Sequence, residues 1–163
     1  MLTFDQVFDR LISHEGGYVR NSADPGGETK FGISKRSYPN LDIAKLDIGT
    51  AKAIYLKDFW QPLGDAHPAI KFQAFDFAVN SGIQTAHRHL QRVLGVADDG
   101  HFGPVSRAAL AAAQVNDVLF LYIAARLDFM TRLSIWPNFG KGWSRRIATN
   151  LCYAAKDQKE SDQ

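Results

Sequence analysis

HEGGYVRNSADPGGETKFG, residues His14–Gly32, combines acidic residues with closely spaced turn-forming residues. Glu15 comes at the end of a helical pattern, and Gly16-Gly17 ends that helix. Asp24-Pro25-Gly26-Gly27 then turns the chain back before Thr29. A carboxyl group that is fixed at a helix end and faces a tight hairpin is suited to general-acid chemistry. The stretch therefore predicts an active-site hairpin.

Length and composition limit what this hairpin is attached to. The chain has 163 residues, 45% of them hydrophobic, which is enough to bury one sizeable core. The formal net charge of +2 demands no anionic partner, and no run of Lys and Arg lies on an aromatic platform, so we expect no nucleic-acid binding. Cys152 is the only cysteine, which excludes an intramolecular disulfide and a Cys-based metal site.

Apolar residues at helical spacing predict a mainly α fold around the hairpin. Thr3 is the expected N-cap of an amphipathic helix that runs to about His14. The segment 69–81 is rich in Ala, Phe and Val with few charges, so it is expected to be the central, buried helix. The remaining helices are predicted over 48–60, 83–94, 104–113, 115–133 and 143–156. Residues 18–33 are the one segment expected to form β-structure.

Two of these expectations concern details of helix geometry. The residues expected on the buried side of the 48–60 helix are Ala51, Ala53, Ile54, Tyr55 and Phe59. The residues Pro137, Gly140 and Gly142 predict a break before the last helix, and the polar tail 157–163 is expected to fray.

The hairpin residues suit the hydrolysis of a glycosidic bond. Glu15 is the candidate general acid, because partial burial among apolar residues raises the pKa of a carboxyl group. Asp24 is expected to stay ionised in a wet turn and to stabilise developing positive charge. Thr29 is a candidate for holding the attacking water, as an inverting glycosidase requires.

The same stretch, extended to HEGGYVRNSADPGGETKFGIS, closely resembles the signature of glycoside hydrolase family 108, a group of bacterial and phage N-acetylmuramidases. DFAVNSG, LQRVLGVADDGHFGPVSRAAL and PNFGKGW resemble that family's C-terminal half, often described as a predicted peptidoglycan-binding region. The resemblance implies a mainly α, lysozyme-like fold with one small β-hairpin element at the active site. It also implies that Glu15 is the essential catalytic glutamate.

Asp24 and Thr29 match by order the Glu, Asp and Thr triad of phage-type lysozymes, with one residue fewer between Asp and Thr. Glu28, next to Thr29, is the alternative residue for a role in this triad. The resemblance covers nearly the whole chain and implies one domain, 1–163. Within it we expect a catalytic lobe at 1–66, a helical lobe with the predicted peptidoglycan-binding region at 67–156, and the tail at 157–163.

Three residues are predicted to contact sugar. Asn80 belongs to an Asn-x-Gly element similar to one that borders the substrate cleft of several lysozyme-like enzymes, although capping of the helix end through Gly82 is an equal alternative. Tyr18 and Trp60 are the aromatic candidates, and a core position is the alternative for a tryptophan.

No metal ion or cofactor is expected. His87, His89 and His101 lack the HExxH spacing and have no supporting cysteine, and Asp98-Asp99 fits a helix-connecting turn better than a calcium loop. His14, beside Glu15, is expected to interact with helix-terminal carbonyl groups.

The sequence thus predicts a peptidoglycan hydrolase, used as an endolysin, that cleaves the β-1,4 bond between N-acetylmuramic acid and N-acetylglucosamine. Charges among the first residues exclude a secretory signal, and no transmembrane run is present. We therefore expect a monomer made in the bacterial cytoplasm, with no membrane insertion, that reaches periplasmic peptidoglycan after a holin-type protein permeabilises the membrane. A lytic transglycosylase on the same bond and a non-catalytic wall-binding or secretion-accessory protein remain alternatives.

Overall fold

The computed structural model describes residues 2–12, 17–20 and 27–161. The chain forms two compact units, one made of Thr3–Gln61 and the other of Met1–Leu2 with Pro62–Gln163. The predicted lobe boundary, between residues 66 and 67, lies close to this division and stays a prediction.

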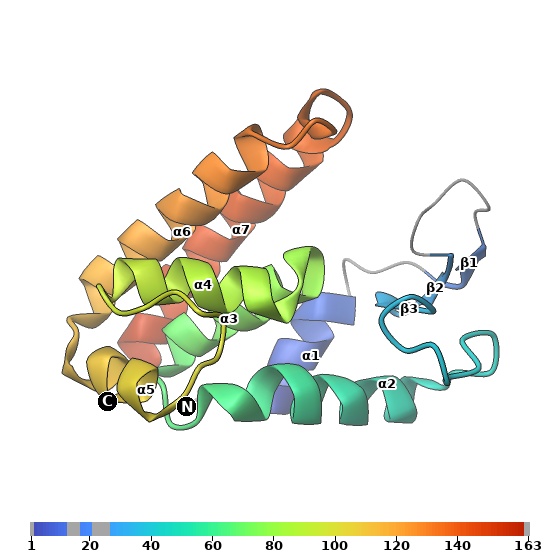
Figure 1. Cartoon of the computed structure of the whole chain (residues 1–163), viewed down its shortest axis with the longest axis horizontal. Coiled ribbons are helices and arrows are strands. Elements are labelled where there is room, and N and C mark those ends of the chain that lie inside the picture. The colour runs from blue at the N-terminus through green and yellow to red at the C-terminus, as the bar shows by residue number, and fades with distance from the viewer. Residues whose placement is uncertain (1, 13–16, 21–26, 162–163) are drawn as a thin grey trace. The chain divides into compact units, whose positions relative to one another are not determined.

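In its described residues, the first unit contains helices and a small antiparallel sheet (Figure 1). Its elements are α1 (Phe4–Ile12), β1 (Val19–Arg20), β2 (Glu28–Lys30), β3 (Ile33–Ser34), α2 (Ile48–Ile54) and a π-helical segment (Tyr55–Trp60).

A capping box begins α1. The Thr3 hydroxyl accepts a hydrogen bond from the Gln6 amide at 3.3 Å, and the Gln6 side-chain oxygen accepts one from the Thr3 amide at 2.9 Å. This reciprocal pair satisfies two amide groups that a helix start leaves without intrahelical acceptors. The predicted Thr3 cap is thereby confirmed, and the helix buries Val7, Phe8 and Leu11 on one face.

The predicted helix over 48–60 changes type within its length. It is α-helical to Ile54 and then π-helical over Tyr55–Trp60, where the Gln61 amide donates to the Leu56 carbonyl. Two aromatic pairs join this segment to α1: the ring centroids of Phe8 and Tyr55 are 6.2 Å apart, and those of Phe4 and Trp60 are 5.8 Å apart. The expected burial of Ala53 is wrong, because its side chain is exposed on the opposite side.

In the residues described, the regular elements of the second unit are all helices. A short 3-10 turn at Gln61–Leu63 leads into α3 (Pro68–Ser81), α4 (Ile83–Val93), α5 (Pro104–Ala112), α6 (Val115–Thr131) and α7 (Trp136–Ser161).

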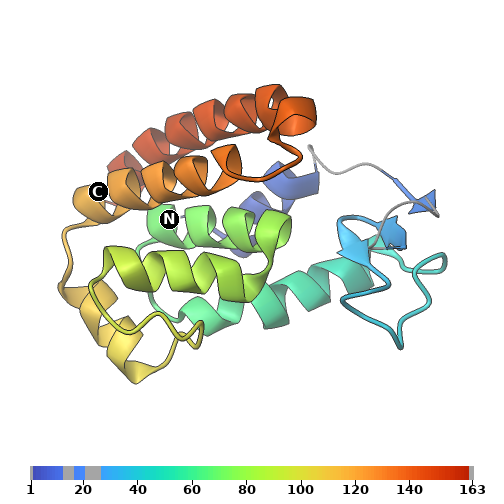
Figure 2. The same cartoon turned by 45° about the horizontal axis from the view of Figure 1, so that its top comes forward.

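Helix α3 is the centre of this unit, as predicted. It contacts α4, α6 and α7, and Figures 1 and 2 both show α6 running beside α7. Residues around its whole circumference are buried, among them Phe72, Phe75 and Phe77. A helix that is apolar on all sides is typical of the interior of a bundle.

The predicted break at Pro137, Gly140 and Gly142 is wrong, because all three residues lie inside α7. Pro137 is the second residue of the helix, where the missing amide hydrogen costs no intrahelical bond. The helix also continues past its predicted end at Lys156 to Ser161 and buries Asp157, while the expected fraying of the tail stays a prediction.

None of the described helices is by itself long and apolar enough to cross a membrane. Helices α5 and α6 meet that criterion only when taken together, and they are bent by 118° relative to each other.

Candidate functional site

Thr29 is the one predicted catalytic residue that the structure describes, since Glu15 and Asp24 lie outside the described residues. It is the middle residue of β2, the central strand of the sheet, and pairs with Val19 of β1 and Ser34 of β3. Its side chain is half-buried. The roles predicted for all three residues stay predictions.

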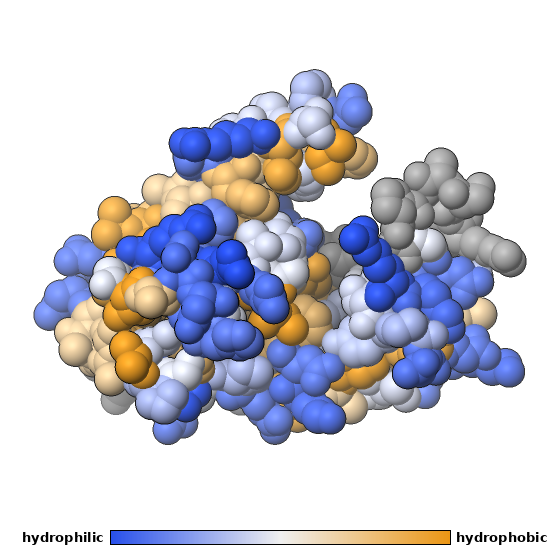
Figure 3. Space-filling view, viewed as in Figure 1, coloured by the Kyte–Doolittle hydropathy of each residue, from blue (hydrophilic) through white to orange (hydrophobic). Residues whose placement is uncertain are grey.

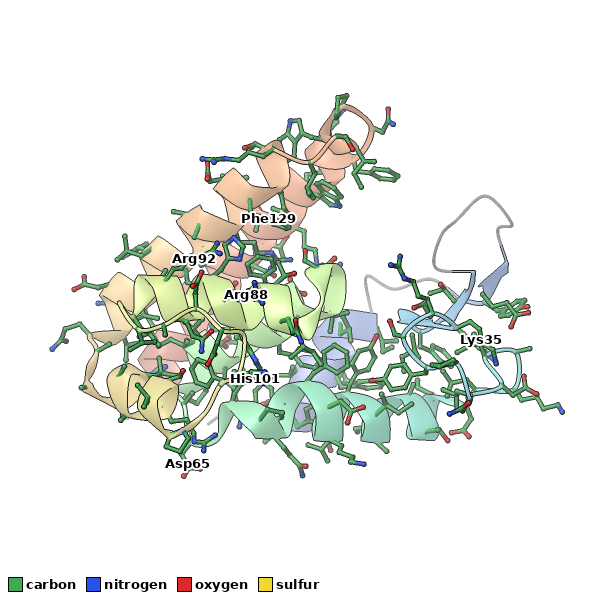
Figure 4. The ribbon with its side chains drawn as sticks, in the orientation of Figure 1. Lys35, Asp65, Arg88, Arg92, His101 and Phe129 are labelled. Carbon is green, nitrogen blue, oxygen red and sulfur yellow. The ribbon has the colours of Figure 1, made fainter. Side chains whose placement is uncertain are left out.

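Glu28, the alternative residue for a role in the triad, precedes Thr29 on the same strand. Side chains alternate between the faces of a strand, so Glu28 and Thr29 point to opposite faces of the sheet. The Glu28 carbonyl accepts a hydrogen bond of 2.8 Å from the Lys35 amide, and the Lys35 ammonium group donates to the Leu41 carbonyl at 2.7 Å (Figure 4). These bonds join β2 to the segment that follows the sheet.

A two-residue turn fixes the register of β2 and β3. Phe31 and Gly32 both have positive φ, 51° and 78°, as a type I′ turn requires. Positive φ is unfavourable for a residue with a side chain. The Tyr55 hydroxyl donates to the Phe31 carbonyl at 2.8 Å, and the Lys30 ammonium group donates to the Ala44 carbonyl at 3.0 Å. The strand that carries Thr29 is therefore anchored to the π-helical segment.

The two aromatic residues predicted to contact sugar differ in exposure. Tyr18, which directly precedes β1, is 42% exposed. Trp60 is only 9% exposed, and its ring packs on Phe4. Most of the Trp60 indole is therefore buried, while the Tyr18 ring keeps a solvent-accessible surface.

Asn80, the third residue predicted to contact sugar, is exposed at the end of α3 and lines a pocket of the second unit. Its side-chain amide donates to the Asp76 carbonyl one turn earlier at 2.6 Å. Gly82 ends the helix with a φ of 88°, and its amide donates to the Ala78 carbonyl. The predicted cap through Gly82 is confirmed, whereas the sugar contact of Asn80 stays a prediction.

A buried ionic cluster lies behind this pocket, and the sequence reasoning did not identify it. The Asp76 carboxylate accepts hydrogen bonds of 2.7 Å from Arg126, Arg146 and Asn150. These residues come from α3, α6 and α7, so the cluster joins three helices. The sequence feature that could have indicated this cluster is the presence of two charged residues, Asp76 and Arg126, within strongly apolar helical patterns.

The two arginines decide the charge state of Asp76. Burial raises the pKa of this carboxyl group, but the positive charges of Arg126 and Arg146 outweigh burial and bring the pKa to about 2. Asp76 is therefore ionised at neutral pH. The carboxylate forms ion pairs of 2.7 Å with both Arg126 and Arg146.

The histidines considered as ligands have structural contacts. His87 is buried against Phe102, and its Nδ1 lies 3.2 Å from the Gly100 carbonyl oxygen, so Nδ1 carries the proton. Burial lowers the pKa of His87. In the described part of the chain, His, Cys, Asp and Glu side chains form no group of three that is arranged to hold a metal ion.

Comparison with known proteins places these features in a wider context. The structure is similar to the solved structure of SagA from Brucella abortus, with 28% sequence identity, a TM-score of 0.87 and coverage of 98% of both chains. The predicted mainly α, lysozyme-like fold with a small β-element is confirmed. No curated protein matches the sequence significantly. Residues 8–82 match the family model described as Glycosyl hydrolase 108, and this match supports a glycoside hydrolase.

Proposed function

We propose that the protein is a peptidoglycan hydrolase of the N-acetylmuramidase type, which cleaves the β-1,4 bond between N-acetylmuramic acid and N-acetylglucosamine. The match of residues 8–82 to the Glycosyl hydrolase 108 model carries this proposal, because it includes the whole of His14–Gly32. The similarity to SagA over 98% of both chains supports a shared fold.

In the proposed mechanism Glu15 protonates the leaving glycosidic oxygen. Asp24, as a carboxylate, stabilises the positive charge that develops on the sugar ring. Thr29 orients the attacking water, and its place on the central strand between two paired neighbours gives it a fixed backbone position. The proposed contacts to the glycan are Tyr18, Trp60 and Asn80. Tyr18 is the more exposed of the two aromatic residues.

A Glu15→Gln variant tests the assignment of the general acid. We expect it to lose at least about a hundredfold of the rate of reducing-end release from purified sacculi, since general-acid catalysis contributes roughly that much or more. Glu28→Gln is the matched control, because it removes the neighbouring acid of the same stretch. Full activity of Glu15→Gln would exclude Glu15 from catalysis. Loss in Glu28→Gln alone would transfer the role to Glu28.

Mass spectrometry of the released fragments distinguishes hydrolysis from the alternatives. Reducing muramic acid ends indicate a hydrolase, whereas anhydro-muramyl ends indicate a lytic transglycosylase. Sedimentation with sacculi without release of soluble fragments would instead indicate a wall-binding or secretion-accessory protein.

We further propose that the chain acts as an endolysin, made in the bacterial cytoplasm and delivered to periplasmic peptidoglycan with the help of a holin-type protein. Expression alone is then expected to leave cell turbidity unchanged, and co-expression with a holin is expected to cause lysis. Lysis by the chain alone at the same expression level would contradict dependence on a holin.

A further inference from the structure

Phe31 lies at the tip of the β2–β3 hairpin, two positions after Thr29. In the described part of the chain it is the only residue other than glycine with a positive φ, at 51°. This backbone region is sterically unfavourable for a residue with a Cβ atom. A type I′ turn favours asparagine, aspartate or glycine at this place. The needs of the turn therefore do not explain why an aromatic residue occupies it.

Two hydrogen bonds hold the tip of the hairpin in place. The Tyr55 hydroxyl donates to the Phe31 carbonyl at 2.8 Å. The Lys30 ammonium group donates to the Ala44 carbonyl at 3.0 Å. Both partners come from the chain after the sheet, so the turn is fixed from outside the hairpin. Residues in strained conformations persist where their surroundings fix them, and they concentrate at functional sites and ligand contacts. The strain at Phe31 thus indicates a function for its side chain.

Packing in the aromatic core does not account for the Phe31 ring. The side chain is half-buried, and no aromatic ring of the described residues pairs with it. Aromatic residues elsewhere in the first unit pair with one another, namely Phe4, Phe8, Tyr55, Phe59 and Trp60. Phe31 therefore lies outside this core, and part of its surface stays accessible to a ligand.

The Lys30 ammonium group lies over the Phe31 ring, 5.6 Å from its centroid. A cation at this distance is attracted by the face of an aromatic ring. Because the Ala44 carbonyl holds the same ammonium group, the contact restricts the orientation of the ring from one side. The ring is thus a flat apolar surface in a defined place, close in sequence to Thr29. A surface that is ordered before binding loses less entropy when a ligand arrives.

The surroundings of Phe31 indicate the class of ligand. Figure 3 shows mostly hydrophilic surface over the part of the first unit that contains the sheet. Thr29 and Ser34, which pair directly across β2 and β3, supply hydroxyl groups on the same hairpin. A sugar ring packs its C–H groups on an aromatic face while its hydroxyl groups contact polar neighbours. A single flat ring among polar groups therefore suits a carbohydrate better than a wholly apolar ligand.

We propose that the Phe31 ring stacks on a sugar ring of the peptidoglycan glycan strand. The identity of the glycan rests on the proposed function. The unfavourable backbone conformation is retained because it presents the ring at the hairpin that carries Thr29. A residue that is strained for the sake of binding has a testable property: its replacement by a residue suited to the turn stabilises the protein and weakens substrate binding.

Phe31→Asn tests both halves of this statement in the full chain. We expect the melting temperature to rise by about 2 to 4 °C, because relief of the positive φ outweighs loss of the contact with Lys30. On glycan strands freed of peptide by an amidase, KM should rise about tenfold with kcat within about twofold of the wild type, since stacking binds the substrate and the transition state alike. A lower melting temperature or an unchanged KM overturns the proposal.

Two further variants separate the flat ring from its apolar character. Phe31→Leu keeps an apolar side chain and the strained backbone, so it should raise KM as Phe31→Asn does without raising the melting temperature. Phe31→Tyr keeps the ring and should have a KM within about twofold of the wild type. A wild-type KM in Phe31→Leu, or an equal loss in Phe31→Tyr and Phe31→Leu, would show that stacking is not the role of this ring.

Direct binding separates this proposal from the proposed function. A tetrasaccharide of alternating N-acetylglucosamine and N-acetylmuramic acid is added to the full chain carrying Glu15→Gln, and the C–H signals of the sugar are followed by NMR. Stacking on an aromatic face moves these signals upfield, and we expect Phe31→Leu in the same background to reduce the shift. No upfield shift, or equal shifts in the two proteins, overturns the stacking. Absence of cleavage by the wild type together with the expected shifts would refute the proposed function and support the stacking.

Discussion

Gly140 lies in the first turns of α7, although glycine is a poorer helix former than every residue except proline. A Cβ atom added at this position would come within 2.6 Å of the Trp136 indole. The glycine therefore allows the indole to lie directly on the helix backbone, from where it packs against Trp143 with ring centroids 6.0 Å apart. The glycines were read as a break in the helix, because sequence alone does not show that the Trp136 ring lies over the backbone at Gly140.

Gly140→Ala is expected to destabilise the protein by about 1 to 2 kcal/mol, since displacement of the Trp136 ring outweighs the better helix propensity of alanine. Gly142→Ala is the matched control on the same helix. A Cβ there meets no atom within 4 Å, so the variant should be more stable by up to about 1 kcal/mol. Urea denaturation measures both, and equal effects at the two positions would contradict this account of Gly140.

His87 is expected to make stability depend on pH. Burial lowers its pKa in the folded protein, so the unfolded chain binds the proton more readily. The contribution of neutral His87 to stability is then fully present above the pKa of His in the unfolded chain, about 6.5, and decreases as the pH falls below that value. His87→Gln should flatten the dependence of the melting temperature between pH 7 and pH 5. An unchanged slope in the variant would mean that other groups cause the dependence.

At the scale of elements, the Asp76 cluster joins helices that are distant in sequence. Asp76 in α3 pairs with residues of α6 and α7, 50 to 74 positions away. Removal of one charge from a buried ionic cluster leaves the others without compensation, which costs more than the loss of an exposed pair. The cluster therefore stabilises the particular arrangement of these three helices.

Asp76→Asn is expected to cost about 3 kcal/mol or more in the free energy of unfolding, because Arg126 and Arg146 lose their carboxylate partner in the interior. Asp98→Asn, which breaks the exposed pair with Arg92, should cost much less, because water screens an exposed ion pair. The pKa of Asp76 is lowered to about 2, so its contribution is present above about pH 4 and is lost as the pH falls through 2. Denaturant titrations at pH 7 and pH 2 measure both effects. Similar losses in the two variants at pH 7 would refute the role of the cluster.

The elements differ in how far the sequence predicts them. Helices α3, α4, α5 and α6 lie close to their predicted bounds, because long apolar patterns with glycine or proline at their ends define them well. The start of α7 was not predictable from the same rules, because a proline in the first turn of a helix and a proline in a break look alike in sequence. The cluster around Asp76 was also missed, since sequence alone does not reveal contacts between residues so far apart.

At the scale of the whole molecule, the chain consists of two units, and the second contains a complete helical core. Helix α3 and its partners α4, α6 and α7 all belong to this unit, as do all members of the Asp76 cluster. The fold class was predictable from the hairpin residues, since glycines, proline and acids at this spacing are distinctive, whereas the roles of Glu15, Asp24 and Thr29 stay predictions. The pocket that Asn80 lines was not predictable, because its wall combines residues from three helices.

A fragment of residues 62–163 is expected to fold by itself. Its core is formed by contacts within the second unit, and it should show helical circular dichroism with a cooperative thermal transition. It should release no fragments from sacculi, since it lacks Glu15. A fragment without a cooperative transition would show that the second unit depends on Thr3–Gln61 for its stability.

The π-helical segment Tyr55–Trp60 affects how this sequence aligns with related ones. In an ordinary α-helix, five residues correspond to about 500°, so Tyr55 and Trp60 would point about 140° apart. A π-helical turn contains about one residue more than an α-helical turn. Because of this extra residue, the Tyr55 and Trp60 rings both contact α1. This is the pattern of a single-residue insertion absorbed inside a helix. Related chains that lack it should align with a one-residue gap between these two aromatic positions and keep both contacts to the first helix.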